Sequence, residues 1–256
     1  MIEEQILFST QVIFILVSIL FLIGTLIKNN AIADIFWGLG FVVVSNINYF
    51  LFSSQTDLHL LINILITIWG LRLALHIGSR KKLSNEDYRY KNFRKSWKKL
   101  FLLRAYFQIY ILQGTLLLII STPVYILMND KNLTLSSVQI IAVSIWLVGF
   151  YFEAVGDAQL RAFIKTKKKD EIMTKGLWKY TRHPNYFGEV LMWWSIFLFS
   201  FGSTNFLYGL ISPILLTYLL LYVSGIPMLE KKYDKNKAFQ KYKKETNALI
   251  PWFPKR

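Results

Sequence analysis

Cysteine is absent from this sequence, and histidine is scarce, with three residues among 256. The absence of cysteine excludes disulfides, thiolate catalysis and cysteine-ligated metal sites. His59, His76 and His183 lie far apart and form no HExxH pair, so we expect no metal site. None of the 13 glycines forms a GxGxxG motif, which argues against a soluble dinucleotide-binding domain.

Long apolar runs dominate what is present. The chain is 54% hydrophobic with a positive mean hydropathy, which is more apolar than a water-soluble domain of this length. Seven stretches reach or nearly reach the roughly 20 residues that a helix needs to cross a bilayer core, the sixth being short: 6–27, 31–53, 58–78, 101–127, 136–158, 187–202 and 205–226. The first lacks a basic n-region and a small-residue cleavage site, so we interpret it as a span and not as a signal peptide. The sequence predicts an all-α, polytopic membrane helix bundle that forms one domain over residues 1–256.

Basic residues are concentrated in three blocks, and the net charge is +15. Nine of the 30 lysines and arginines lie in 79–100, eight in 159–184 and nine in 229–256. The intervening loops at 54–57, 128–135 and 203–204 contain only Lys131. Cytoplasmic loops retain basic residues. Seven spans would therefore place the N-terminus outside and the basic C-terminal segment 229–256 in the cytoplasm. The blocks form no continuous groove, so we expect a lipid bilayer as the partner and no nucleic acid.

Acidic side chains are costly inside a membrane and usually face a bundle interior or a polar cavity. Four lie within the predicted spans: Asp34, Glu153, Asp157 and Glu189. The spacing of Glu153, Asp157 and Arg161 places all three on one helical stripe, and Asn185 and Glu189 repeat the i, i+4 spacing. We expect the two stripes to converge near the cytoplasmic edge. The alternatives are interhelical ion pairs that lock the bundle and, for Asp34, helix capping.

The segment 176–189 reads GLWKYTRHPNYFGE and concentrates polar chemistry at the start of one span. A proline near the first turn leaves backbone N–H groups directed at the preceding loop. Together with Arg182 these groups would form an anion site suited to phosphate or carboxylate.

This segment, the stripe from Glu153 to Arg161 and the terminal Ala248-Leu249-Ile250-Pro251 together resemble the DUF1295 membrane family, which is related to the C-terminal domain of steroid 5-alpha-reductases. Upstream strings extend the resemblance over nearly the whole chain: Asp34-Ile35-Phe36-Trp37-Gly38-Leu39-Gly40-Phe41, Trp69-Gly70-Leu71-Arg72, Glu86-Asp87-Tyr88-Arg89-Tyr90 and Gln113-Gly114. The short RHPxYxG string also occurs in isoprenylcysteine carboxyl methyltransferases.

The resemblance implies a seven-helix bundle that binds NADPH in a cytoplasm-facing cavity. It implies reduction of a carbon–carbon double bond conjugated to a carbonyl in a lipophilic, steroid-like or isoprenoid-like substrate. The cofactor-binding residues that it implies are Glu153, Asp157, Arg161, Arg182, His183, Asn185, Tyr186, Glu189 and Tyr242. The candidate catalytic residues are Asp34 and Arg72. Two departures are Glu153, where many steroid reductases have Asn, and Glu171, in place of a phosphate-binding Arg.

Two other functions remain open from the sequence. One is S-adenosylmethionine-dependent methylation of a lipophilic acceptor, in which Arg182, His183 and Glu230 would bind the cofactor and the acceptor carboxylate. The other is a non-enzymatic transporter or scaffold, although the sequence contains no paired repeats. For each function we expect a multi-pass integral membrane protein of a bacterial inner membrane or of the endoplasmic reticulum. The substrate and the oligomeric state are left open.

Overall fold

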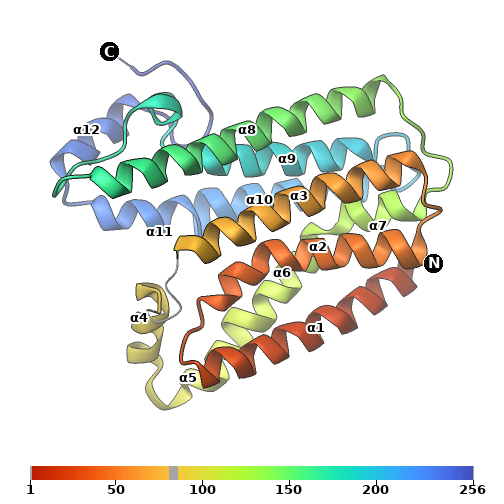
Figure 1. The fold of residues 1–256 in the computed structure, drawn as a ribbon, viewed down its shortest axis with the longest axis horizontal. Coiled ribbons are helices and arrows are strands. Elements are labelled where there is room, and N and C mark those ends of the chain that lie inside the picture. Colours follow the sequence, from red (N-terminus) through yellow and green to blue (C-terminus); the bar gives the residue numbers. More distant parts are fainter. Residues whose placement is uncertain (1, 81–85, 256) are drawn as a thin grey trace. The chain divides into compact units, whose positions relative to one another are not determined.

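The computed structural model describes residues 2–80 and 86–255, and every regular element in these two ranges is a helix (Figure 1). Six helical segments are long and apolar enough to cross a membrane, as judged by length and composition: Ile2–Leu26, Ile32–Phe52, Asp57–Ser79, Tyr88–Ile120, Ser137–Thr166 and Phe206–Tyr233. The predicted class, an all-α polytopic membrane bundle, is confirmed.

The chain divides into two compact units. Unit 1 comprises Met1–Thr134 and Gly202–Gly209, and unit 2 comprises Leu135–Phe201 and Leu210–Arg256. The single domain over 1–256 stays a prediction.

Unit 1 is built on three long helices and a segmented fourth one. The long helices are α1 (Ile2–Leu26), α2 (Ile32–Phe52) and α3 (Asp57–Arg80). A short 3-10 turn, η4 (Phe206–Leu210), begins in this unit. The helices α2 and α3 pack at very short range. A Cβ atom added to Gly38 would lie only 2.5 Å from the carbonyl oxygen of Gly70, so the absence of a side chain at Gly38 permits this approach. Such close approach between small residues is typical of helix pairs in membranes, where it increases van der Waals contact.

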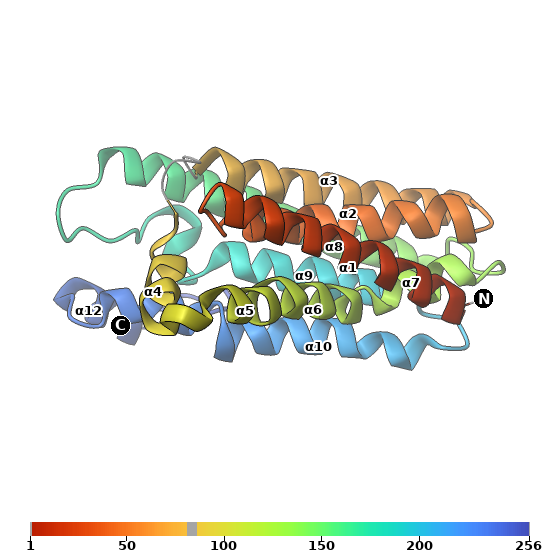
Figure 2. The same cartoon turned by 90° about the horizontal axis from the view of Figure 1, so that it is seen from below.

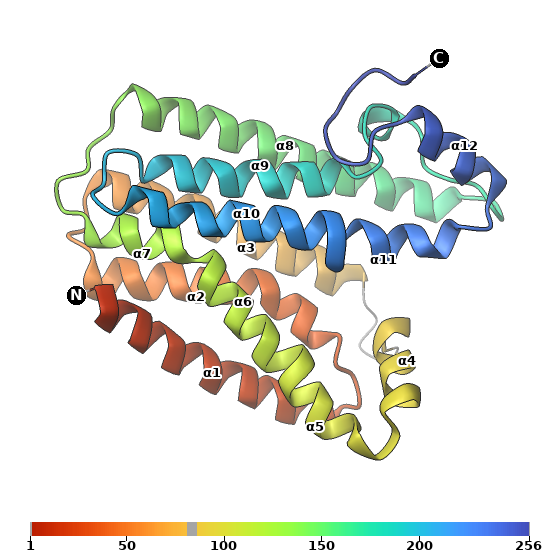
Figure 3. The same cartoon turned by 180° about the vertical axis from the view of Figure 1, so that it is seen from behind.

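The fourth predicted span, 101–127, differs from one straight helix. It consists of α5 (Phe101–Ala105), the π-helical η2 (Tyr106–Ile111), α6 (Leu112–Ile120) and α7 (Thr122–Asn129), and it is preceded by α4 (Tyr88–Trp97) and η1 (Lys98–Leu100). Lys98 takes a left-handed φ of 46°, and the chain bends there. Figures 2 and 3 both show α4 set across the direction of α5 and α6. Pro123 stands in the first turn of α7, where its missing N–H costs no hydrogen bond.

Unit 2 is organised around α8 (Ser137–Thr166) and α9 (Pro184–Phe199), which run side by side (Figure 1). The two helices are antiparallel. Gln139, near the start of α8, donates its side-chain amide to the carbonyl oxygens of Phe199 and Phe201, whereas Gly156, near the other end of α8, packs against Pro184. The remaining elements are η3 (Gly176–Lys179), α10 (Ile211–Tyr218), η5 (Leu219–Val223), α11 (Ile226–Glu230), η6 (Lys231–Tyr233) and α12 (Lys237–Glu245).

The helix α9 corresponds to the sixth predicted span and has 16 residues, which makes it about 24 Å long. It is therefore shorter than the six segments of spanning length. Its antiparallel packing along α8, from Gly156 to Gln139, supports a further crossing. The count of seven spans and their orientation stay predictions.

Candidate functional site

The facing sides of α8 and α9 bury a cluster of polar side chains in unit 2. Glu153, Asp157 and Glu189 are 2%, 4% and 7% exposed. The side-chain amide of Asn185 donates a hydrogen bond of 3.2 Å to Asp157 Oδ1. The predicted convergence of the two stripes is thus confirmed at Asp157 and Asn185. Since the helices approach closely through Gly149 and Gly188, these side chains are held on a tightly packed pair.

One atom of this cluster is a buried acceptor without a protein partner, namely Oδ1 of Asn185. A buried polar atom of this kind is costly unless a ligand or water satisfies it. One turn beyond Asp157, Arg161 is exposed at the end of the stripe. A ligand with hydroxyl or amide donors and a phosphate group therefore fits this set: an acceptor at Asn185, a carboxylate at Asp157 and a cation at Arg161.

The loop before α9 is tied to the C-terminal segment through Arg182. Its Nε atom lies 2.7 Å from Glu230 Oε1, and its Nη1 atom donates to the carbonyl oxygens of Lys243 and Thr246. Its backbone N–H donates to the carbonyl oxygen of Asn247 at 2.9 Å. Arg182 is 8% exposed, and its guanidinium already binds a carboxylate and two carbonyls. The role of Arg182 as an anion ligand therefore stays a prediction, and these partners give it a structural role.

Glu230 receives two further groups besides Arg182. His183 Nε2 lies 3.1 Å from Glu230 Oε1, and Lys243 Nζ lies 2.9 Å from Glu230 Oε2. His183 also stacks on Tyr186, with 5.5 Å between ring centroids. Burial lowers the pKa of His183, and the charge of Arg182 adds to this effect, whereas Glu230 opposes it. A cavity of about 470 Å³ adjoins Arg182, Glu230 and Lys243.

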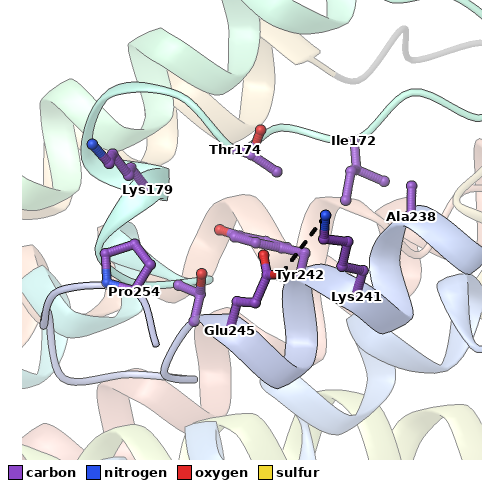
Figure 4. Close-up of a pocket in the computed structure, with 9 residues that line it drawn as sticks. Ile172, Thr174, Lys179, Ala238, Lys241, Tyr242, Glu245 and Pro254 are labelled. Atoms are coloured by element: carbon purple, nitrogen blue, oxygen red, sulfur yellow. Dashed lines mark ion pairs between the residues drawn. The ribbon is translucent and has the colours of Figure 1, made fainter. Parts of the chain in front are cut away.

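The C-terminal segment is held to the same loop by backbone and hydroxyl bonds. Tyr242 donates its hydroxyl to the carbonyl oxygen of Trp178, and Thr181 donates its hydroxyl to that of Leu249 at 2.7 Å. Burial raises the pKa of the Tyr242 hydroxyl. Tyr242 also lines a cavity of about 340 Å³ between the loop before η3 and α12, with Lys241 paired to Glu245 at its edge (Figure 4). The cofactor role of Tyr242 stays a prediction.

In unit 1, Asp34 forms the centre of a second polar cluster at the start of α2. Tyr90 donates its hydroxyl to Asp34 Oδ1 at 2.6 Å, and Arg89 Nη2 lies 2.7 Å from Asp34 Oδ2. The N-cap residue of α2 is Ala31, which makes no side-chain cap. Asp34 lies in the first turn of α2, and both of its carboxylate oxygens bind side chains of α4.

A supporting network lies beside this cluster. Glu86 accepts hydrogen bonds from the side chain of Asn30 at 3.0 Å and from Arg94 at 3.1 Å. The hydroxyl of Tyr110 donates to Asn30 Oδ1 at 3.0 Å. Burial raises the pKa of Glu86, but the hydrogen bonds from Arg94 and Asn30 outweigh it and leave that pKa below its usual range. These contacts fasten α4 to the connection between α1 and α2.

The sequence-predicted residues are thus divided between the two units. Asp34 and Arg72 lie in unit 1, where Arg72 is half-buried on α3, and the nine predicted cofactor residues lie in unit 2. Sequence reasoning missed Tyr90 and Arg89 as partners of Asp34. A signal existed in the string Glu86-Asp87-Tyr88-Arg89-Tyr90, which contains both residues.

The apolar helices place this chain in the class of polytopic helical membrane proteins. Within that class, it buries carboxylates on a tightly packed helix pair. The chain belongs to the family described as "Protein of unknown function (DUF1295)", whose pattern matches residues 20–246. It is also similar to the uncharacterized protein C594.04c of Schizosaccharomyces pombe, with 25% identity over 188 residues. That match covers 64% of this chain and 52% of the relative, so the chain spans about half the length of the relative. No solved structure matches this chain.

Proposed function

We propose that this protein is a membrane oxidoreductase that uses NADPH to reduce a carbon–carbon double bond conjugated to a carbonyl in a lipophilic substrate. The observation that carries the proposal is the arrangement of Tyr90, Asp34 and Arg89. It provides a buried hydroxyl donor that a carboxylate orients and a guanidinium supports.

Reduction of an enone places negative charge on its carbonyl oxygen as the β-carbon gains a hydride. A hydroxyl donor directed at that oxygen stabilises the developing enolate. Tyr90 is 4% exposed and can exchange its bond to Asp34 for a bond to the carbonyl oxygen. Arg89 neutralises Asp34 throughout, so the exchange leaves no unpaired buried charge.

The cofactor residues that fit best are those of the α8–α9 cluster. NADPH would supply the hydride when bound. Asn185 and Asp157 would accept hydrogen bonds from amide or hydroxyl groups, and Arg161 would bind a phosphate group. Glu153 and Glu189, buried on the same two helices, would help to orient these groups.

A second candidate is S-adenosylmethionine-dependent methylation of a lipophilic acceptor. The favouring observation is that Arg182, His183 and Glu230, the three residues this reading requires, lie in direct contact. However, Arg182 is occupied by Glu230 and by two backbone carbonyls, which leaves it poorly suited to bind an acceptor carboxylate. We therefore favour the reductase.

The proposal is tested with Tyr90→Phe, which removes the hydroxyl and keeps the ring. Asp34 retains Arg89, so we expect the variant to fold. NADPH oxidation in the presence of lipophilic enones, followed by absorbance, should fall by about 100-fold. Stabilisation by NADPH alone should persist.

Tyr208→Phe is the matched control, because Tyr208 is 74% exposed in the same unit. It should retain full turnover. Turnover of the Tyr90→Phe variant at the rate of this control would contradict the assignment of Tyr90.

A further inference from the structure

The basic residues of α4 and the turn η1 differ in their contacts. Arg89 and Arg94 bind Asp34, Asp87 and Glu86. The lysines form an outer set of exposed residues: Lys91, Lys95, Lys98 and Lys99. Within residues 2–80 and 86–255 no acidic side chain pairs with any of these four. The arginines thus bind acids of unit 1, whereas the outer lysines have no acidic partner among these described residues.

The outer lysines stand where the apolar exposed surface of the fourth span begins. Leu100, Leu102 and Leu103 follow at once and are each more than half exposed. Exposed leucines on a spanning segment face the hydrocarbon core, so the lysines lie at headgroup depth. The half-buried Trp97, stacked on Phe93 with 4.6 Å between ring centroids, is typical of the membrane–water interface.

The backbone places α4 in a suitable orientation for this role. The left-handed conformation of Lys98 turns the chain between α4 and α5. As a result α4 lies across the direction of the following span (Figures 2 and 3). A short helix with aromatic residues and an outer row of lysines in this orientation is typical of an interfacial helix.

We propose that the outer lysines of α4 and η1 bind the headgroups of anionic phospholipids in the adjoining leaflet. Ammonium groups on flexible stems suit phosphate groups that move laterally, because they need no fixed bidentate geometry. Their attraction to an anionic surface adds up over the four residues. The inner face of the same helix holds Tyr90 and Arg89 on Asp34, so bound lipid also steadies this cluster.

The test compares two variants with the same change in charge. One replaces Lys91, Lys95, Lys98 and Lys99 by Gln. The control replaces four exposed lysines of unit 2 by Gln: Lys165, Lys167, Lys168 and Lys169. Purified full-length protein is reconstituted in phosphatidylcholine bilayers, and its relative affinity for spin-labelled phosphatidylglycerol over phosphatidylcholine is measured at low and high salt.

We expect the relative affinity for phosphatidylglycerol to fall at least about fivefold in the α4 variant and to stay at the wild-type value in the control. The selectivity of the wild type should fall at high salt, because salt screens exposed charges. Equal losses in both variants, or no loss in the α4 variant, would overturn the proposal.

If the variant with four substitutions folds poorly, the double variant Lys91→Gln, Lys95→Gln on the regular helix replaces it, with the same criteria. A fall in NADPH affinity of the α4 variant in neutral detergent, with lipid selectivity retained, would assign the lysines to a nucleotide phosphate instead.

Discussion

At the scale of single residues, Arg182 shows how one side chain joins distant parts of the sequence. Its guanidinium connects the loop before α9 to Glu230, 48 residues away, and to carbonyl oxygens more than 60 residues away. A buried ion pair with complete hydrogen bonding adds little net stability, but removing one partner leaves the other charged and buried. The contribution of Arg182 to the free energy of unfolding should therefore be seen mainly when its side chain is removed.

The first prediction concerns the free energy of unfolding of the Arg182→Met variant. We expect a loss of about 3–5 kcal/mol, because Glu230 and two carbonyls lose their buried donor. Lys243→Met is the control. Its side chain also contacts Glu230 but is 42% exposed, so solvent screens it and the loss should stay below about 1 kcal/mol. Denaturant titration in detergent measures both, and similar losses in the two variants would contradict the structural role of Arg182.

The second prediction concerns pH and His183. Its pKa in the folded protein lies below the ordinary value of 6.5 because the ring is buried. As pH falls below 6.5, His183 binds a proton in the unfolded chain but not in the folded protein. The free energy of unfolding therefore decreases toward lower pH until the pKa of His183 in the folded protein is reached. The slope from this one group is at most about 1.4 kcal/mol per pH unit. The His183→Gln variant, melted over the same pH series, should lack this component, and an unchanged slope would show that His183 does not titrate in this way.

At the scale of elements, the antiparallel pair α8 and α9 positions the polar cluster of unit 2. Its side chains meet because the two backbones nearly touch at Gly149 and Gly188. A Cβ atom on Gly188 would lie 2.3 Å from the carbonyl oxygen of Gly149 and 2.6 Å from the amide nitrogen of Glu153. Neither backbone atom can move without displacing a helix.

Gly188→Ala should therefore lower the free energy of unfolding by about 1–3 kcal/mol, because overpacking forces the helices apart. It should also reduce stabilisation by nucleotide, since Asp157 and Asn185 would separate. Gly78→Ala is the control, because the nearest atom to its added Cβ would be 3.9 Å away. Melting curves of the two variants in detergent provide the comparison. A Gly188→Ala variant as stable as Gly78→Ala would be incompatible with this close packing.

Element-scale contacts also explain which parts of the site were predictable. The meeting of Asp157 and Asn185 follows from i, i+4 spacing on two apolar helices that adjoin in sequence. The partners of Asp34 lie 55 and 56 residues away on α4, beyond the intervening helix α3, and apolar periodicity does not reveal such long-range contacts. Likewise, the segmentation of the predicted span 101–127 depends on local backbone geometry that hydropathy does not detect.

At the scale of the whole molecule, the distribution of charge predicts the topology. All three basic blocks lie on one side only if the number of spans is odd, which predicts that α9 is a seventh crossing besides the six segments of spanning length. A reporter fused after Arg256 should therefore be cytoplasmic, and one inserted at Lys131 should be external. The same location for both reporters would contradict the seven-span topology.

The central claim, an NADPH site on the α8–α9 pair, is tested most directly by melting curves with and without saturating NADPH. Binding to the folded state alone stabilises it, by about 2.7 kcal/mol at 100 times Kd, so the wild type should melt at higher temperature with NADPH and shift less with S-adenosylmethionine. Asp157→Asn retains an acceptor for Asn185, and Glu189→Gln retains its shape, so both variants should fold with nearly wild-type stability. Both should lose the shift induced by NADPH. A shift of wild-type size in both variants would contradict the assignment of these residues to the cofactor site.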